Sequence, residues 1–383
     1  MKIAYVVPRC LPSNSHGGYV LELARVLGQG HDVRIFSSAF PADRTIPATL
    51  TRIPLPDRPA VARLAAWWAV SRFLVAGGRF DVIHTQGGDA PVGTVVSAPC
   101  CNRAIRLALE AAGEAGRSYA RRRPAWLTGV TARLAETADR TCLSRAGVRR
   151  VIVPARHVER DLDVLYGVPP AKMTLVPYGV DLDAFSPAVA RARRAVVRQA
   201  FGFRPADVVA VYVGGAYRLK GLLPLLEALR RVPDPAFRLM AVGVRENAEL
   251  AGERARGLEG RVTFAGRVPD IADAYAAGDL FVHPTLYDGF SLATLEAMAS
   301  GLPVVVSRRA GVADLLADGR EGVLLEQPTD PDEIARALER LRGDAPGRAE
   351  LGGRARATAE LNSSETMARR TLAVYQSVDG GAG

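Results

Sequence analysis

The sequence contains almost no lysine. Of its 50 basic side chains only three are lysines, at positions 2, 172 and 220, and the other 47 are arginines. A lysine ammonium is a compact charge on a flexible stem, whereas a guanidinium is a wide planar fork. Lys220 lies in AYRLKG, directly after the strand-like segment VVAVYVGG. The pattern leaves two interpretations, a phosphate ligand or an exposed lysine at the start of a helix.

Cysteines and long apolar segments are also scarce. The four cysteines show no metal-ligand spacing, and the adjacent Cys100 and Cys101 cannot readily bridge each other, so we expect reduced thiols. No run reaches the roughly 18 apolar residues of a membrane-spanning helix. The opening MKIAYVVPRCLPS is broken by proline too early for a signal peptide. We therefore expect a cytoplasmic protein, soluble or peripheral on the inner face of the plasma membrane.

Two Asp-x-Asp pairs are the candidates for a metal ligand. Asp161 and Asp163 lie in the amphipathic helical segment ARHVERDLDVLYG, where a solvated face is the simplest explanation. Asp181 and Asp183 lie in a connector, where aspartates cap turns and helices. We expect no metal ion and no cofactor.

Excess positive charge is confined to the first half of the chain. The net charge is +10, but residues 1–180 hold 24 basic and 13 acidic side chains, whereas residues 181–383 hold 26 and 27. The first half should face something anionic, such as a phospholipid surface, a phosphorylated acceptor or nucleic acid. No nucleic-acid recognition motif is present, so we expect no nucleic-acid partner.

Aromatic residues accompany arginines in two segments of this basic half. The predicted helix 60–76 carries Arg63 and Arg72 with Trp67, Trp68 and Phe73, and Arg121, Arg122 and Arg123 precede Trp126. Such mixtures suit an anionic membrane interface. The alternative is that Trp67 and Phe73 pack into the core while the arginines are solvated.

Strands alternate with helices in two series, which predicts parallel sheets covered on both faces. The first series has strand-like runs at KIAYVV, HDVRIFSS, LTRIPL, DVIHT, GTVVSA, RRVIVPA and MTLVP. The second has them at DVVAVYVGG, FRLMAVG, RVTFAG, DLFVHPT, LPVVVS and GVLLE, with helices starting near 219, 246, 270, 290 and 331 and ending with 347–360 and 364–377. Two doubly wound domains joined near residue 180 are expected to bind ligand at the carboxyl ends of their strands.

Two glycine-containing loops are candidate phosphate sites. Gly17 and Gly18 open a helix after the first strand, where free amides suit an anion, although Gly-Gly at this position is also common for packing. In HPTLYDGFSLATLEAMASGLPVVVS, the loop around Asp288 and Gly289 leads into a helix whose first amides can hold a diphosphate. Glu296 lies further along that helix among apolar neighbours, and its carboxylate can accept two hydrogen bonds from a ribose diol.

These motifs, with the connector YGVDLDAF and VGGAYRLKG, resemble over essentially the full chain the family four retaining nucleotide-sugar glycosyltransferases (glycosyl transferases group 1). The resemblance implies an α/β GT-B fold, two doubly wound Rossmann-like domains facing across a cleft. We expect an acceptor-binding domain at 1–179 and a donor-binding domain at 180–362. Residues 363–383 should form a helix that packs back on the first domain, followed by a disordered tail.

The resemblance also assigns roles to single residues. It implies that Lys220 contacts the donor diphosphate and that Glu296 binds the ribose. The full set of expected donor contacts is Gly17, Gly18, Gly215, Lys220, Asp288, Gly289, Phe290, Ser291, Leu292 and Glu296. The expected catalytic residues are Lys220, Arg218, Asp288, His84 and Asp89.

The chain departs from the family pattern at three places. Family members usually have glutamate at the position of Asp288, so the donor sugar is expected to sit differently or to be a different sugar. Members often have arginine where this chain has Gly215, and Arg218 is the candidate replacement. The family histidine after the fifth strand is absent from TVVSAPCCNR, which leaves His84 and Asp89 as polar candidates. The last pattern is closer to the lipopolysaccharide-core glucosyltransferases.

The reaction implied is a metal-independent, retaining hexosyl transfer from a nucleotide diphosphate sugar, with UDP as the expected nucleotide, to a hydroxyl of a glycan or lipid-linked acceptor. Cell-envelope polysaccharide or lipopolysaccharide biosynthesis is the expected context, in a monomer or weak dimer. The alternatives are transfer to a small natural-product acceptor and a sugar-nucleotide epimerase of the same architecture. The base, the sugar and the acceptor are not readable from the residues.

Overall fold

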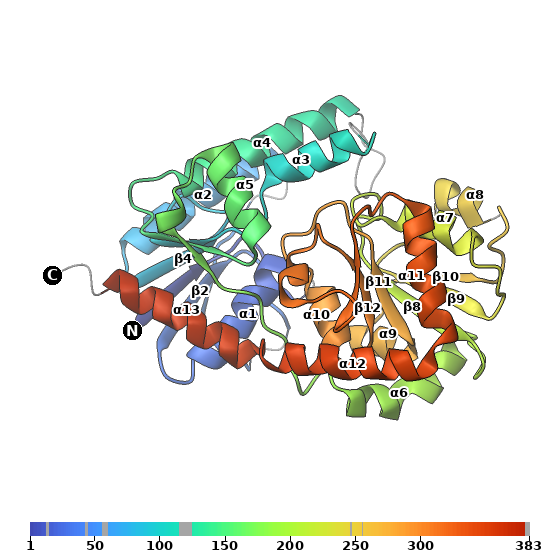
Figure 1. Cartoon of the computed structure of the whole chain (residues 1–383). Helices are drawn as coiled ribbons and strands as arrows, with labels where there is room; N and C mark the ends of the chain where they lie inside the picture. The colour runs from blue at the N-terminus through green and yellow to red at the C-terminus, as the bar shows by residue number, and fades with distance from the viewer. Residues whose placement is uncertain are drawn as a thin grey trace. The chain divides into compact units, whose positions relative to one another are not determined.

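The computed structural model describes residues 1–12, 15–42, 45–55, 60–114, 125–245, 247–254 and 256–379. Contacts between these residues divide the chain into two compact units. Unit 1 consists of the described parts of 1–104, 129–179 and 364–383, and unit 2 of the described parts of 105–128 and 180–363. Each unit is a parallel sheet with helices packed on it (Figure 1).

The sheet of unit 1 has the strand order β3-β2-β1-β4-β5-β6-β7, and every pairing in it is parallel. Its strands are β1 (Lys2–Val6), β2 (Asp32–Ser37), β3 (Thr49–Arg52), β4 (Val82–Gln86), β5 (Val95–Ser97), β6 (Arg150–Val153) and β7 (Met173–Leu175). The helices of this part of the chain are α1 (Ser15–Leu27), α2 (Ala60–Ala76), α3 (Asn102–Ala111), α4 (Ala125–Leu143), α5 (Arg156–Tyr166), the short η1 (Pro170–Lys172) and α13 (Ser364–Asp379). All seven strands match runs predicted from the sequence.

The sheet of unit 2 has the order β10-β9-β8-β11-β12-β13, again with parallel pairing throughout. Its strands are β8 (Val208–Val213), β9 (Phe237–Val242), β10 (Val262–Gly266), β11 (Leu280–His283), β12 (Val304–Ser307) and β13 (Gly322–Leu325). Its helices are α6 (Pro187–Ala200), α7 (Leu222–Arg230), α8 (Ala248–Arg254), α9 (Ile271–Ala277), α10 (Leu292–Ala299), η2 (Gly311–Leu315), α11 (Pro331–Gly343) and α12 (Ala345–Glu360). The prediction of two doubly wound, Rossmann-like α/β domains is confirmed.

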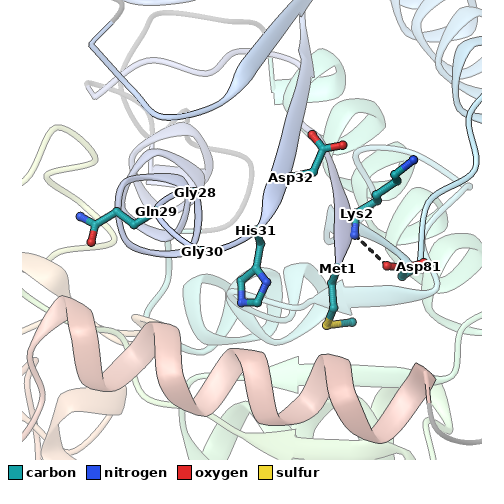
Figure 2. Close-up of a pocket in the computed structure, with 8 residues that line it drawn as sticks. All are labelled: Met1, Lys2, Gly28, Gln29, Gly30, His31, Asp32 and Asp81. Carbon is teal, nitrogen blue, oxygen red and sulfur yellow. Dashed lines mark hydrogen bonds between the residues drawn. The ribbon is translucent and has the colours of Figure 1, made fainter.

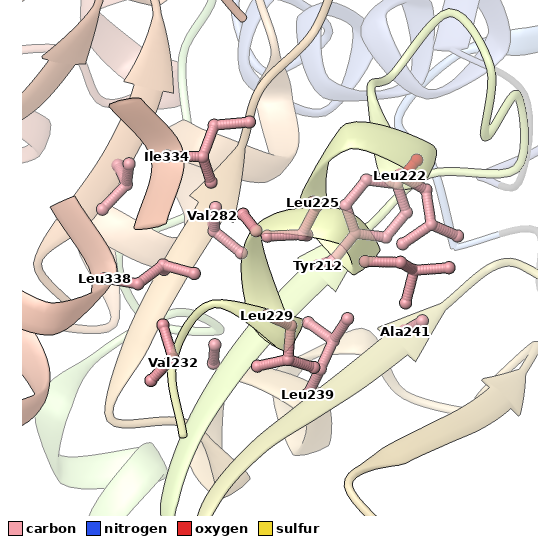
Figure 3. Close-up of a cluster of buried hydrophobic side chains, with 14 of the residues drawn as sticks. Tyr212, Leu222, Leu225, Leu229, Val232, Leu239, Ala241, Val282, Ile334 and Leu338 are labelled. Carbon is pink, nitrogen blue, oxygen red and sulfur yellow. The ribbon is translucent and has the colours of Figure 1, made fainter. Parts of the chain in front are cut away.

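The core of unit 2 explains why VVAVYV reads as an unbroken apolar strand. β8 is covered by helices, so Tyr212 lies fully buried together with Leu225 and Leu229 of α7 (Figure 3). Ile334 and Leu338 of α11 complete this layer. Burying a leucine or isoleucine side chain stabilises a fold by about 1.5–3 kcal/mol, so this contact of α7 with β8 fixes the loop that connects them.

Helix α6 was not predicted from the sequence. It begins with a recognisable signal, because Ser186 caps it by accepting a hydrogen bond from Val189 N (3.3 Å) and Pro187 follows at the first helical position. Arg194 then holds the helix to the end of α9, donating to the Gly278 carbonyl (2.6 Å) and to the Asp279 carboxylate (2.5 Å). The buried Val197 adds an apolar contact, so both arginine contacts and apolar packing hold α6.

Helix α13 belongs to unit 1, although it comes from the far end of the sequence. The Tyr375 hydroxyl lies 2.5 Å from His84 Nδ1 of β4 and donates to the Tyr5 hydroxyl of β1 (3.1 Å). Ser364 Oγ donates to the Glu22 carboxylate of α1 (2.9 Å).

Among the described residues, no helix combines the length and apolar character needed to cross a bilayer.

Candidate functional site

The loops that follow β8 and β11 are joined to each other at the carboxyl edge of the unit 2 sheet. The Leu219 carbonyl accepts a hydrogen bond from Leu286 N (2.8 Å). Gly221 has a φ of 72°, and a Cβ atom there would lie 1.8 Å from the Pro284 carbonyl oxygen. Only glycine fits such a contact. The glycine of AYRLKG therefore lets the two loops touch, and it places Lys220 next to the loop after β11.

Lys220 forms an ion pair with a carboxylate from that second loop. Its Nζ lies 2.5 Å from Asp288 Oδ2, and His283 Nε2 lies 2.9 Å from the same oxygen. Because the carboxylate can only accept, the proton of His283 sits on Nε2. Burial alone would raise the pKa of Asp288, but the charge of Lys220 and the hydrogen bond from His283 lower it well below its ordinary value. Burial lowers the pKa of His283, so its ring is neutral.

The predicted amide loop leads into α10 through Gly289, Phe290, Ser291 and Leu292. Ser291 has φ 76° and is the single non-glycine residue with positive φ among the described residues. Phe290 N donates to Asp288 Oδ1 (3.4 Å), so one of the predicted amides is already engaged by a side chain. Leu292 starts the helix, where the first N–H groups have no intrahelical acceptor and suit an anion. The strained backbone at Ser291 is typical of a functional site.

Glu296 lies one turn along α10 from Leu292 and is held by a tyrosine. The Tyr275 hydroxyl donates to Glu296 Oε2 (2.6 Å), and Tyr275 itself is fully buried on α9. The pKa of Tyr275 is raised well above its ordinary value, first by burial and then by the charge of Glu296. The carboxylate predicted to bind a ribose therefore has a fixed orientation. Tyr275 is a residue that sequence reasoning missed, because only packing brings α9 to α10.

Arg218, like Lys220, is paired with carboxylates of its own chain. Its guanidinium lies 2.5 Å from Glu114 Oε2, a residue grouped with unit 2, and also pairs with Glu249. These two carboxylates offset its charge, and its expected role toward the diphosphate stays a prediction. Gly215 is exposed, and a Cβ there would come no closer than 3.4 Å to the Gly243 carbonyl, so the backbone does not require glycine.

His84 is buried in the core of unit 1. Its side chain is 0% exposed, between the Tyr375 hydroxyl and Ser97 Oγ (2.7 Å), and Tyr19 lies edge-on to its ring. Burial lowers the pKa of His84 to about 3. The imidazole is a neutral part of the unit 1 core with both ring nitrogens hydrogen-bonded, which argues against the expected catalytic role of His84. His84 lies in β4 two residues before the strand ends.

Asp89, in contrast, reaches a partly exposed position in unit 1. Its Oδ2 lies 3.0 Å from His16 Nδ1, and its side chain is 20% exposed. Asp139 of α4 lies nearby and accepts from Gly88 N (2.9 Å) and from the Asn102 side chain (2.7 Å). Burial raises the pKa of Asp139 to about 6. Sequence reasoning missed both residues: His16 directly precedes Gly17 and Gly18 but was not singled out, and Asp139 belongs to no motif.

The two glycines at the start of α1 differ in how closely other atoms pack against them. A Cβ on Gly17 would lie 2.5 Å from both the Arg9 carbonyl oxygen and the Leu11 amide nitrogen, so the preceding loop packs directly on it. A Cβ on Gly18 would meet nothing closer than the Pro12 carbonyl oxygen at 3.5 Å. Close packing is thus reason enough for Gly17, and the donor-binding role of the pair stays a prediction.

The aromatic residues of α2 divide between core and surface. Trp67 is buried, and it and Trp68 both donate their ring N–H to the Asp89 carbonyl (2.9 and 3.0 Å). Phe73 is 79% exposed and Arg72 is exposed beside it. Trp67 therefore has a structural role, whereas Phe73 does not pack into the core. The side chains of Arg63, of the three arginines at 121–123 and of Trp126 lie outside the described residues.

Neither Asp-x-Asp pair forms a metal site within the described residues, where no group of three or more His, Cys, Asp or Glu is arranged to hold an ion. Asp181 Oδ1 accepts from the Asp183 and Ala184 amides (both 3.0 Å) and so caps a turn, as predicted for that pair. None of the four cysteines forms a disulfide.

A separate pocket near His31 and Asp81 of unit 1 contains none of the predicted site residues (Figure 2).

Comparisons with known families divide the chain in the same way as its two sheets. Residues 17–184 match the family model described as Glycosyltransferase Family 4. Residues 207–344 match the model described as Glycosyl transferases group 1. The second match contains Lys220, Asp288, Ser291 and Glu296, which are the residues that the structure gathers after β8 and β11.

Two curated relatives of the chain are glycosyltransferases. The chain is 34% identical over 242 residues to D-inositol 3-phosphate glycosyltransferase 2 of Catenulispora acidiphila, and 31% identical over 242 residues to the D-inositol 3-phosphate glycosyltransferase of Kribbella flavida. Each alignment includes 59% of this chain, and the chain spans about half the length of these relatives, 55% and 56%.

Two solved structures share the fold of the whole chain. WaaG, a glycosyltransferase involved in lipopolysaccharide biosynthesis, superposes with a TM-score of 0.80 at 20% identity over 100% of both chains. Anabaena HepE in complex with UDP and glucose superposes with a TM-score of 0.74 at 20% identity, over 98% of this chain and 100% of its own. At these identities the likeness is one of fold.

Proposed function

Because the chain belongs to the family 4, group 1 glycosyltransferases, with one sheet domain matching each family model, we propose that it transfers a sugar from a nucleotide diphosphate sugar to an acceptor hydroxyl. The observation that carries the proposal is the arrangement of Lys220 and Asp288 at the start of α10. A cation and a helix N-terminus on one sheet edge suit a diphosphate, and Glu296 on the same helix suits a ribose.

In the proposed reaction the bond from the sugar to the diphosphate breaks ahead of attack. Negative charge then builds on the leaving phosphate, where Lys220 and the first amides of α10 stabilise it without a metal ion. The acceptor hydroxyl attacks from the face of the leaving group, and the anomeric configuration is retained. The charges that do this work are fixed in advance, because His283 and Asp288 hold the lysine in place.

UDP is the proposed nucleotide, and this choice is supported by the UDP complexes of HepE, a protein of the same fold. The proposed acceptor is a hydroxyl of a glycan or lipid-linked molecule of the cell envelope. The name of WaaG supports the envelope context, and the names of the relatives support a phosphorylated polyol. A small natural-product molecule is the second candidate acceptor. We expect the first domain to select between the two.

Peripheral membrane binding is part of the proposal. It is supported by the charge of residues 1–180, with 24 basic and 13 acidic side chains, and by the exposed Phe73 next to the exposed Arg72. The test is co-sedimentation with vesicles containing phosphatidylglycerol at rising salt, with Phe73→Ala and Arg72→Ala as variants. Binding that never appears at low salt contradicts this part.

The first experiment on the donor site is a thermal-shift panel with UDP, GDP, ADP and their common sugar conjugates. A ligand that binds only the folded state raises the melting temperature by mass action. We expect UDP to stabilise the wild-type protein and the control Lys172→Ala, and we expect Lys220→Ala and Glu296→Ala to lose the shift. No shift with any nucleotide contradicts the proposal. Turnover of UDP-N-acetylglucosamine without an acceptor would favour the epimerase instead.

A further inference from the structure

A buried amide at the end of β4 has no hydrogen-bond partner. Gln86 is 1% exposed, and neither its Nε2 nor its Oε1 makes a hydrogen bond within the described part of the chain. Burying an amide without partners is unfavourable, and natural folds seldom keep one without a use. Gln86 is the last residue of β4, at the carboxyl edge of the unit 1 sheet, where ligands of doubly wound folds bind.

The strand geometry directs Gln86 toward helix α1. Side chains alternate along a strand, so Gln86 lies on the same face as His84, two residues earlier. His84 contacts Tyr19 of α1 on that face, with ring centroids 6.1 Å apart. Helix α1 follows β1, the neighbour of β4 in the sheet. Gln86 is further along the strand than His84 and therefore closer to the first residues of α1, where His16 lies.

A tight turn returns the chain from Gln86 toward the same place. Asp89 N donates to the Gln86 carbonyl (2.9 Å), and the Asp89 carboxylate then meets His16 Nδ1 at 3.0 Å. The Asp89 carbonyl accepts hydrogen bonds from both Trp67 and Trp68, so helix α2 holds this turn in place. The His16 side chain is 30% exposed. With Nδ1 held by Asp89, the Nε2 atom of His16 is the ring nitrogen left to meet a ligand.

The chemistry of these groups selects the class of ligand. The Gln86 amide offers one donor and one acceptor, and a hydroxyl group needs both. The carboxylates of Asp89 and Asp139 face His16 from the turn and from α4, and this negative charge disfavours a phosphate at the same spot. Burial lowers the pKa of His16, but Asp89 and Asp139 outweigh it and raise the pKa overall.

We propose that Gln86 and His16, oriented by Asp89, bind hydroxyl groups of a polyol acceptor such as a sugar or a cyclitol. This inference rests on the proposed function and names the part of the acceptor that unit 1 holds. Any phosphate on that acceptor binds elsewhere. Gln86 and His16 are then substrate-contacting residues, and Asp89 is a positioning residue.

The test follows the His16 ring by NMR while the full-length protein is titrated with myo-inositol, glucose or inorganic phosphate. Variant His16→Gln assigns the signal among the five histidines. We expect myo-inositol or glucose to move the His16 signal at millimolar concentration, and phosphate not to move it. Gln86→Leu should weaken the polyol response about 10- to 100-fold, the usual effect of losing a buried hydrogen-bond partner. The control Gln29→Leu, an exposed glutamine of unit 1, should leave the response unchanged.

Stability provides a second readout that separates binding from structure. Since Gln86 has no partner within the described residues, we expect Gln86→Leu to keep or raise the melting temperature. A structural role for the amide predicts a lower one. A silent His16 signal with both polyols, a response to phosphate alone, or a destabilised Gln86→Leu would each overturn the inference. The UDP thermal shift, measured on the same variants, reports the proposed function independently and should be unchanged in all of them.

Discussion

The ammonium of Lys220 and the carboxylate of Asp288 lie 2.5 Å apart, so the cation proposed to hold the donor diphosphate is paired with a carboxylate of its own chain. His283 holds the same carboxylate oxygen at 2.9 Å. A diphosphate that approaches Lys220 must either share the ammonium with Asp288 or displace it. Lys220 is therefore expected to favour donor binding, and Asp288 is expected to oppose it.

Replacing Asp288 tests this opposition. In Asp288→Asn the ammonium of Lys220 loses its competing anion, so UDP should bind as tightly as in the wild type or more tightly. Sugar transfer should fall about 100-fold or more, because the lysine is no longer held for the leaving phosphate. Isothermal titration with UDP and a kcat measurement give the two values. A loss of UDP affinity as large as in Lys220→Ala would contradict the prediction.

Lys220 itself should not tolerate exchange for the residue this chain otherwise prefers. Lys220→Ala is expected to lower kcat/KM by about 100- to 1,000-fold, the range seen when one preorganised charge donor is removed. Lys220→Arg should recover only part of this loss, since a planar guanidinium does not fit a contact built for a point charge. Lys172→Ala, which removes a lysine of unit 1, is the matched control and should keep wild-type kinetics.

The shifted pKa of Asp288 predicts an effect on acid stability. Burial opposes, but Lys220 and His283 together lower the pKa of Asp288 in the folded protein. A carboxyl with a lowered folded pKa stabilises above its unfolded pKa, about 3.9, and loses this contribution as the pH falls below that value. Urea unfolding of Asp288→Asn between pH 6 and pH 2 should thus show a weaker loss of stability below pH 4 than the wild type. Parallel curves for the two proteins would refute it.

Ser291 carries the strain at the start of α10. With φ 76° it occupies a region that glycine adopts freely and β-branched residues avoid. Ser291→Val should lower the free energy of unfolding by about 1–3 kcal/mol. In Ser291→Gly the relieved strain offsets the loss of the 2.7 Å hydrogen bond to Thr294, so its stability should stay near that of the wild type. Thermal melts of the two variants test this prediction, and equal losses of stability would contradict backbone strain at Ser291.

His84 should influence stability and leave chemistry alone. Its folded pKa of about 3 lies below the ordinary value of 6.5, so the buried ring resists protonation. Stability should therefore decline as the pH falls from 6.5 toward 3, by up to about 1.4 kcal/mol per pH unit. In His84→Gln this part of the slope disappears. A folded His84→Gln protein should retain kcat at pH 7, and a large loss of kcat would restore His84 as a catalytic candidate.

The fold was predictable because its signals are local. Most strands of both sheets appear as apolar runs such as KIAYVV or DVVAVYVGG, bounded by turns or polar residues, whereas β3 is TLTR and overlaps the predicted run LTRIPL only in part. Helix α6 was not predicted, although its alanines and valines and its Ser186 cap followed by Pro187 are helix signals that the sequence carries. The contacts of Arg194 with the carbonyl and carboxylate groups beside α9 are visible only in three dimensions.

The site was predictable only where a motif carries it. Lys220 and Asp288 belong to recognisable segments, and the structure brings them together. Their partner His283 lies in the same segment, five residues before Asp288, yet the sequence alone does not show that its ring meets the carboxylate. Tyr275, the partner of Glu296, comes from a separate helix and belongs to no motif. The pairing of Arg218 was not predictable for a related reason, since its two carboxylate partners come from distant segments, at positions 114 and 249. Electrostatic pairing of this kind is visible only in three dimensions.

The hydrogen bonds of Tyr375 have a consequence for biosynthesis. During translation, Tyr5 and His84 leave the ribosome long before the helix 364–379 exists, and until then the Tyr375 hydroxyl is not available to either of them. Domains usually fold in the order in which they emerge. Here the six strands of unit 2 are synthesised before unit 1 acquires its last helix, so the buried contacts of Tyr375 with Tyr5 and His84 can form only after residues 364–379 have left the ribosome.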